Sequence, residues 1–169
     1  MAEGQEKALH ILVEDNVAKA VLTELLRRVD ASFLSSTGIC CGGDAVTLKT
    51  TIHAIKATGL PVAVVLDGDQ QPTPKSNIFT LPGTQPPEKE IFRSEAARDY
   101  LQHTYNLNLG DFVAGLGDLD HHEWIPRLSK RACQEETMLT VELARVYAGS
   151  VSEAEAASLL HQLKEASRK

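Results

Sequence analysis

Three acidic side chains each directly follow a short apolar segment of the kind that forms a buried β-strand. Glu14 stands in the run ILVEDN, and Asp67 and Asp69 stand in the run AVVLDGDQ. Ligands of an open parallel α/β sheet bind outside the carboxyl ends of its strands, so two such strands can bring these carboxylates together. Alternate residues of an extended segment face the same side, and we expect Asp67 and Asp69 to face one ion. Carboxylate oxygens suit Mg²⁺, so the pattern predicts a divalent-metal site.

Acidic residues at such positions also have a simpler interpretation. Asp is favoured at helix N-caps and in the loops that follow strands, where it needs no ligand. This interpretation is sufficient for either segment alone. Two acidic segments that each follow a buried strand favour the metal site.

The segments that carry these acids predict a mostly parallel sheet. Residues 8–13 (ALHILV) and 62–67 (VAVVLD) are typical of buried strands, 31–41 (ASFLSSTGICC) predicts a weaker strand, and 77–81 (NIFTL) predicts a short fourth one. Apolar residues at three- and four-residue steps predict a helix after each of the first two strands. The two apolar stripes consist of Ala18, Val21, Leu22, Leu25, Leu26 and Val29, and of Ala45, Leu48, Ile52 and Ile55. Two strand–helix units that lead into a third strand are typical of a doubly wound α/β fold.

The second half of the sequence predicts helices. From about Pro87 onward four segments have helical patterns: residues 88–105, 121–133, 135–148 and 152–166. Ser152 and Glu155 have the spacing of a capping box at the start of the last segment. We expect a catalytic core over residues 1–117 and a helical extension over 118–169 that packs on it, so that the two form one structural unit.

Composition limits the classes of function. With 169 residues, 43% of them apolar, the chain suits one domain, and 17 basic against 23 acidic residues give a net charge of −6. This charge argues against a basic surface that wraps nucleic acid, although carboxylates that bind metal ions also count as negative. The three cysteines do not form a disulfide framework, the first ten residues lack the apolar segment of a signal peptide, and no eighteen apolar residues run together. We therefore expect a soluble protein of the cytoplasm without a membrane partner.

One known family that places acids in this way is the response-regulator receiver domain, which ILVEDN and VVLDGDQQPTP resemble. That resemblance implies a signalling module phosphorylated on Asp67. A receiver needs a helix between this strand and the next, but only seven residues lie between Asp69 and the segment NIFTL. A helical crossover needs about ten or more residues, and no Lys-Pro step follows downstream. The receiver interpretation therefore stays as the alternative.

A second family fits more of the chain. A Glu at the end of the first strand and an Asp-x-Asp at the end of the third, here Glu14, Asp67 and Asp69, resemble the pattern of the Toprim domain. VEDNVAKAVLTELL, GGDAV, LDGD, LPGTQPPEKEIF and DLDHHEW resemble, in the same order, the Toprim region of the OLD (overcoming lysogenization defect) family of ATP-dependent nucleases. The resemblance implies a Toprim, Rossmann-like fold with a mostly parallel four-stranded sheet flanked by helices and a helical C-terminal part.

The resemblance also implies an activity. It implies an endonuclease that depends on one or two Mg²⁺ or Mn²⁺ ions and nicks or cleaves DNA, in phage defence or DNA repair. The chain contains no P-loop, so the ATPase that the family uses would be a domain absent from this chain or a separate partner. A homodimer stays open. In place of the family's Val-Glu-Gly and a second acid four residues after the Glu, this chain has Asp15 and Ala18, which leaves the second ion in doubt or moves its ligand to Asp15.

Other residues are candidates for the same site. Glu88 is a candidate outer metal ligand, although an acid in the first turn of a helix also has a purely structural explanation. Gly42 and Gly43 are expected to form a tight turn at the mouth of the site. A basic residue should stabilise the charge of the phosphorane. The candidates for it are Lys89, Lys130 and Arg131. Of these we take Lys130 as the catalytic residue and Lys89, with Gly42 and Gly43, as contacts to the substrate.

The segment around the two adjacent histidines contains residue types that bind zinc. These residues are Asp118, Asp120, His121, His122 and Glu123. The stronger interpretation is structural: Asp120 suits a helix N-cap with Glu123 as its capping-box partner. His121 is then expected to line the DNA groove rather than to bind a metal.

Overall fold

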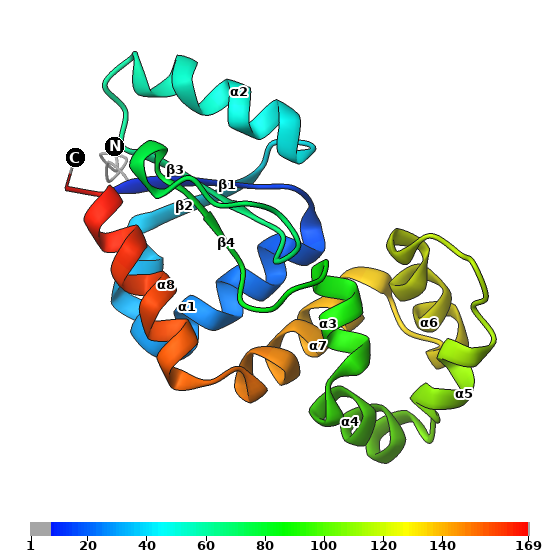
Figure 1. The fold of residues 1–169 in the computed structure, drawn as a ribbon. Coiled ribbons are helices and arrows are strands. Elements are labelled where there is room, and N and C mark those ends of the chain that lie inside the picture. Colours follow the sequence, from blue (N-terminus) through cyan, green and yellow to red (C-terminus); the bar gives the residue numbers. More distant parts are fainter. Residues whose placement is uncertain (1–7, 169) are drawn as a thin grey trace, which may run out of the picture.

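Four parallel strands form one sheet with helices on both of its faces (Figure 1). The computed structural model describes residues 8–168. Most of the first ten residues, in which the sequence predicts no signal peptide, lie outside this range. The strands are β1 (Leu9–Val13), β2 (Thr37–Cys41), β3 (Val62–Leu66) and β4 (Ile78–Thr80), in the order β2-β1-β3-β4. Each strand pairs in parallel with its neighbours, which confirms the predicted four-stranded sheet.

Helices cover both faces of the sheet. Alternate residues of β3 point to opposite faces: Val62 and Val64 pack in the cluster under α2 (Ala45–Lys56), whereas Ala63 and Val65 pack in the larger cluster on the other side. The larger cluster includes residues of α1 (Asn16–Ser36), α7 (Glu136–Ser150) and α8 (Glu153–Ala166). Burial on both faces explains why β3 is apolar throughout rather than alternating. No helix within residues 8–168 is long and apolar enough to cross a membrane.

The strand predicted over residues 31–41 is wrong in its first half. The first helix continues to Ser36 after a kink at Asp30, whose backbone is non-helical (φ −160°, ψ 87°). Asp30 Oδ1 accepts a hydrogen bond of 2.9 Å from Phe33 N and so acts as an N-cap that restarts the helix. Phe33 can then pack in the core, and Lys164 Nζ, 2.6 Å from Asp30 Oδ2, ties the kink to α8. Only Thr37–Cys41 remain as strand.

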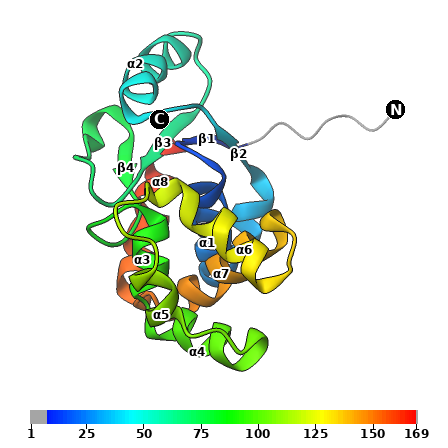
Figure 2. The same cartoon turned by 90° about the vertical axis from the view of Figure 1, so that its right-hand side faces the viewer.

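The helices of the second half form a group beside the sheet before the chain returns along it (Figures 1 and 2). They are α3 (Pro87–Arg93), α4 (Glu95–Tyr105), α5 (Leu109–Ala114) and α6 (Trp124–Ala132), and the short 3₁₀ turns η1 (Pro74–Ser76) and η2 (His121–Glu123) precede β4 and α6. Phe92 lies 6.0 Å from Phe112 and 5.4 Å from Trp124 between ring centroids, which joins α3 to α5 and α6. The predicted boundary at residue 117 falls inside this group, and residues from both sides of it share one hydrophobic cluster.

The sequence predicted one detail of these helices incorrectly and another correctly. The predicted helix over 88–105 is broken at Ser94, which has an extended backbone (φ −70°, ψ 135°). At the last helix, Ser152 Oγ accepts from Glu155 N at 3.2 Å, which confirms the predicted N-cap. The Glu155 carboxylate accepts from the Ser152 hydroxyl at 2.5 Å.

Replacing Ser94 with alanine should destabilise the protein by about 1 kcal/mol, because Ser94 Oγ accepts from Ala97 N at 3.1 Å and caps α4. Urea unfolding followed by circular dichroism measures this loss. The matched control is Ser158→Ala at an exposed position inside α8, where alanine is the better helix former and no loss is expected. Equal stability of Ser94→Ala and the wild type would show that the cap contributes nothing.

Candidate metal centre

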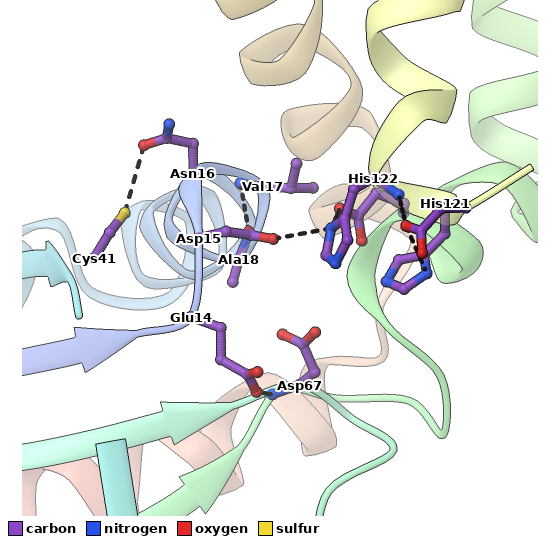
Figure 3. A network of polar contacts seen from close by, with 11 residues as sticks. Glu14, Asp15, Asn16, Val17, Ala18, Cys41, Asp67, His121 and His122 are labelled. Atoms are coloured by element: carbon purple, nitrogen blue, oxygen red, sulfur yellow. Dashed lines mark hydrogen bonds and ion pairs between the residues drawn. The ribbon is translucent and has the colours of Figure 1, made fainter. Parts of the chain in front are cut away.

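Glu14 and Asp67 meet at the carboxyl ends of two adjacent strands (Figure 3). Glu14 follows β1 and Asp67 follows β3, and these strands pair in the sheet. Glu14 Oε1 accepts a hydrogen bond of 3.0 Å from Asp67 N. The sheet therefore places the two carboxylates side by side, as the sequence predicts.

Asp67 is a buried carboxylate whose charge is poorly compensated. The residue is 6% exposed, and its Oδ1 is buried with no hydrogen-bond partner among the described residues. Burial, followed by the negative charges of Glu14, Asp15, Glu88 and Asp69, raises the pKa of Asp67 to about 8. An ionised Asp67 at neutral pH therefore needs a cation beside it.

Asp69 lies near Asp67 but not in the extended geometry that the sequence predicts. β3 ends at Leu66, and Asp67 O accepts from Gln70 N at 3.1 Å, so residues 67–70 form a turn. Asp69 is exposed, and its Oδ1 accepts from Gln70 Nε2 at 3.3 Å. The assumption that Asp67 and Asp69 face one side of a strand is wrong, because the strand has already ended. Asp69 is still near enough to raise the pKa of Asp67.

Glu88 is far more buried than a first-turn helix acid usually is. It is 1% exposed, and its Oε2 has no hydrogen-bond partner among the described residues. Burial, and next the charge of Asp15, raise the pKa of Glu88 to about 7, whereas His122 acts in the opposite direction. Glu88 therefore belongs to the acidic cluster, although α3 starts far from β1 and β3 in the sequence.

Asp15 combines a structural contact with a place at the site. Its Oδ1 accepts from Val17 N and Ala18 N, both at 2.9 Å, and so caps α1. Its Oδ2 lies 3.6 Å from His122 Nδ1. Ala18 is fully buried in the hydrophobic core. Asp15, not residue 18, therefore supplies the second acid beside Glu14.

The two adjacent histidines lie on η2, against α3. Asp120 Oδ1 accepts from His122 N at 3.0 Å, which confirms Asp120 as an N-cap. Glu123 N donates to the backbone oxygen of Asp120 at 3.0 Å instead of to its side chain, so the predicted capping box with Glu123 is not formed. Figure 3 shows His121 and His122 side by side, with His122 facing Asp15. His122 Nδ1 lies 3.4 Å from Glu88 Oε1, and the two imidazole rings are 4.1 Å apart between centroids. Burial, and then the nearby His122, lower the pKa of His121.

His122 was considered only as part of a zinc cluster with its sequence neighbours and was not predicted to lie beside Glu88. The adjacent histidines were a visible signal, but the residue that they meet is Glu88, 34 positions before His122, and not the neighbouring Asp118 or Glu123. Only the packing of η2 on α3 makes this contact. The prediction that His121 lines a DNA groove stays a prediction.

The loop after β4 supports the Asp67 turn. A Cβ atom at Gly68 would lie 2.9 Å from the carbonyl carbon of Gly83 and 3.0 Å from the carbonyl oxygen of Gln85. Glu90 Oε1 in turn accepts from Thr84 N at 2.7 Å and from Gln85 N at 2.9 Å. Gly68 and Glu90, neither of which was a predicted site residue, thus set the backbone on which Asp67 and Asp69 stand.

The glycines and lysines predicted for the site lie at three separate positions in the structure. Gly42 N donates to Val13 O at 2.9 Å across the ends of β2 and β1, and Gly43 has a left-handed backbone (φ +98°) where the chain passes from β2 to α2. Lys89 is half-buried and near enough to Asp120 and His121 to lower the pKa of each. Lys130 is exposed in the last turn of α6, and within residues 8–168 its side chain makes no hydrogen bond or ion pair with the acidic cluster.

The fold and the site together define an α/β domain with a parallel sheet of order β2-β1-β3-β4, in which an acidic cluster lies between the carboxyl ends of the strands and a helical lobe. In the described part of the chain only the turn η1, not a helix, joins β3 to β4, which differs from the receiver pattern.

Two solved structures share this architecture. The C-terminal region of the Xanthomonas campestris pv. campestris OLD protein matches with a TM-score of 0.56 and 18% identity, over 96% of this chain and 96% of that chain. The C-terminal region of the Burkholderia pseudomallei OLD protein matches with a TM-score of 0.57 and 13% identity, over 95% of this chain and 98% of that one. No protein-family model and no curated protein matches the sequence. The chain therefore has the fold of the OLD C-terminal region, as the resemblance of its motifs implied.

Proposed function

We propose that this chain is a divalent-metal-dependent endonuclease domain of the OLD type that hydrolyses DNA phosphodiester bonds. The observation that carries the proposal is the buried, unpartnered carboxylate oxygen of Asp67 beside Glu14. A protein gains nothing in stability from several carboxylates gathered in one partly buried place. Such a cluster is explained if the carboxylates hold cations.

The residues present fit Mg²⁺ or Mn²⁺. Glu14, Asp67 and Asp69 are oxygen donors, and one to three protein carboxylates are a normal complement for Mg²⁺, which keeps several of its waters. Asp15 and Glu88 are the donors available for a second ion. Bound ions of this kind supply Lewis acidity at a phosphoryl oxygen and lower the pKa of a bound water.

The protein's own groups would position the reactants. Glu14 fixes the Asp67 backbone through its hydrogen bond, and its second oxygen is available to accept a proton from water or to bind the ion. The charge of Lys89 lowers the pKa of Asp120 and of His121, so Lys89 lies beside the histidine turn, and it is our first candidate for stabilising charge on the phosphorane. Lys130 remains the second candidate.

The wider biology follows from the resemblance alone. We propose that the domain acts on DNA together with an ATPase, either in the same protein or as a partner, in phage defence or DNA repair in the cytoplasm. A homodimer would be one way to grip DNA. The net charge of −6 supports an external source of DNA affinity, because the chain has no basic excess.

Nicking of supercoiled and linear DNA with Mg²⁺ or Mn²⁺ tests the proposal. We expect the wild type to nick, and Glu14→Gln to lower the rate by about 100-fold or more, because the loss of one ligand removes several kcal/mol of transition-state stabilisation. The control is Glu95→Gln, at an exposed acid in the first turn of α4. Absence of nicking, or equal nicking by Glu14→Gln and the wild type, would contradict the assignment. Beryllofluoride uptake at Asp67 without cleavage would instead favour signalling.

A further inference from the structure

Glu88, His121 and His122 bring three potential ligand atoms together from two distant segments. Glu88 lies in the first turn of α3 and the histidines lie on η2. One ligand atom from each of the three residues lies within 4.8 Å of the other two. Two imidazoles and a carboxylate are a common donor set for zinc and related ions.

A second observation is the unpartnered oxygen of Glu88. The Glu88 side chain is 2% exposed, and its Oε2 is buried without a hydrogen-bond partner within residues 8–168. Its other oxygen, Oε1, faces His122 Nδ1 at 3.4 Å, and Asp15 Oδ2 faces the same nitrogen at 3.6 Å. One imidazole N–H can donate to only one of these carboxylates at a time. The contacts between these side chains therefore leave negative charge and a buried oxygen uncompensated.

We propose that Glu88, His121 and His122 form a site for a divalent transition ion, Zn²⁺ or Mn²⁺, that is separate in its donor type from the carboxylates of Glu14 and Asp67. Imidazole nitrogen favours Zn²⁺ over Mg²⁺, and it binds Mn²⁺ less strongly than Zn²⁺. Asp15 lies beside the site through its contact with His122, so this ion would take the place given above to a second ion, with the two histidines added to Glu88 as donors. Binding of the ion can be measured without DNA cleavage. The proposal rests on the nuclease function only in so far as the bound ion takes part in cleavage.

The three side chains can approach an ion without a change in the hydrophobic core. Zinc–nitrogen and zinc–oxygen bonds of about 2.0–2.1 Å place tetrahedral donors about 3.4 Å apart, so donors that now lie within 4.8 Å of one another need to approach by at most about 1.4 Å. The His122 side chain is 59% exposed and can rotate. Glu88 is fixed by burial and cannot move as freely.

The turn that carries the histidines is anchored to α3. Trp124 follows η2, and its Nε1 donates to Leu119 O at 3.0 Å. The Trp124 ring packs 5.4 Å from Phe92 of α3 between centroids. Asp120 caps the turn through His122 N. These contacts hold the histidines on the same side of α3 as Glu88, as a preformed site requires.

Calorimetric titration of the full chain with Zn²⁺, with Co²⁺ absorption and Mn²⁺ electron paramagnetic resonance as spectroscopic probes, tests the site. We expect a stoichiometric Zn²⁺ site, nitrogen coupling to bound Mn²⁺, and a loss of Zn²⁺ affinity of about 10-fold or more in His121→Ala, His122→Ala and Glu88→Gln. The matched control is His161→Ala on α8, an exposed histidine outside the cluster, which should bind as the wild type does. Circular dichroism of each variant verifies that it is folded.

Two outcomes would overturn the proposal: no Zn²⁺ binding by the folded wild type, or binding that His121→Ala and His122→Ala leave unchanged. Asp67→Asn separates this proposal from the nuclease assignment. Zinc binding that persists in Asp67→Asn while no variant or wild type nicks DNA would support the histidine site and contradict the nuclease function. DNA nicking by a wild type that does not bind Zn²⁺ would contradict the histidine site and support the nuclease function.

Discussion

Replacing Asp67 with asparagine is expected to raise the free energy of unfolding by about 2 kcal/mol at pH 8 in the absence of divalent ions, while it lowers any DNA nicking by about 100-fold or more. Asp67 is buried with an unpartnered oxygen, and its pKa is raised to about 8 by burial and by its acidic neighbours. Asparagine has nearly the same shape but carries no charge. The same residue would therefore reduce stability and support catalysis.

The pH dependence of this effect has a definite sign. The pKa of Asp67 rises from an ordinary value of 3.8 in the unfolded chain to about 8 in the folded protein, so the folded state binds the extra proton between these values. The contribution of Asp67 to stability is therefore fully present below about pH 4 and is lost as the pH rises towards about 8. Glu88 adds a decline of the same sign up to about pH 7. The difference between Asp67→Asn and the wild type should be largest at pH 8 and vanish near pH 4.

Urea unfolding at several pH values, with and without Mg²⁺ or Mn²⁺, measures these effects. Added ion should stabilise the wild type more than Asp67→Asn, because a ligand that binds only the folded state raises stability. The matched control is Asp99→Asn, because Asp99 is exposed on α4, outside the acidic cluster, and its replacement should change stability and ion binding little. A wild type that is more stable than Asp67→Asn at pH 8 without metal would show that the carboxylate is compensated within the protein.

The second large effect is expected for Gly68→Ala, which should destabilise the protein by about 2–3 kcal/mol and reduce metal binding at Asp67. The new Cβ would stand 2.9 Å from the Gly83 carbonyl carbon and 3.0 Å from the Gln85 carbonyl oxygen. These are backbone atoms, and Glu90 holds their loop through two hydrogen bonds, so the clash cannot be relieved by rotating a side chain. The turn that carries Asp67 and Asp69 must move instead.

Thermal unfolding and Mn²⁺ titration of Gly68→Ala measure both effects. Gly149→Ala is the control, since a Cβ there meets nothing within 4 Å and alanine in a helix should add about 0.5–1 kcal/mol of stability. Unchanged stability and Mn²⁺ affinity in Gly68→Ala would show that the loop of Gly83 yields easily and does not set the metal centre.

The sequence by itself determined the sheet and the first half of the site. Short apolar runs followed by acids predict β1 and β3, and the carboxyl ends of parallel neighbours necessarily lie together, so Glu14 and Asp67 meet as predicted. Local signals also identified the caps at Asp120 and Ser152, because a cap depends on residues only a few positions apart.

Local sequence patterns predicted the wrong backbone conformation in two segments whose residues suit more than one conformation. The segment after Asp30 has residues suited to a strand, but the Asp30 cap and the burial of Phe33 make it helical. Asp67 and Asp69 have strand spacing, but the chain turns directly after Leu66. In both places tertiary packing overrides a weak local preference.

Only the tertiary structure decided the other half of the site. Helical periodicity predicts that residues 88–105 and 121–133 form helices, but it does not say against which element each helix packs. The burial of Glu88, the approach of His122 to Glu88 and Asp15, and the seat of Gly68 against the Gly83 loop all join segments far apart in the chain. Such contacts result from how the apolar faces of the helical lobe fit together, and the spacing of residues within each segment does not specify that fit.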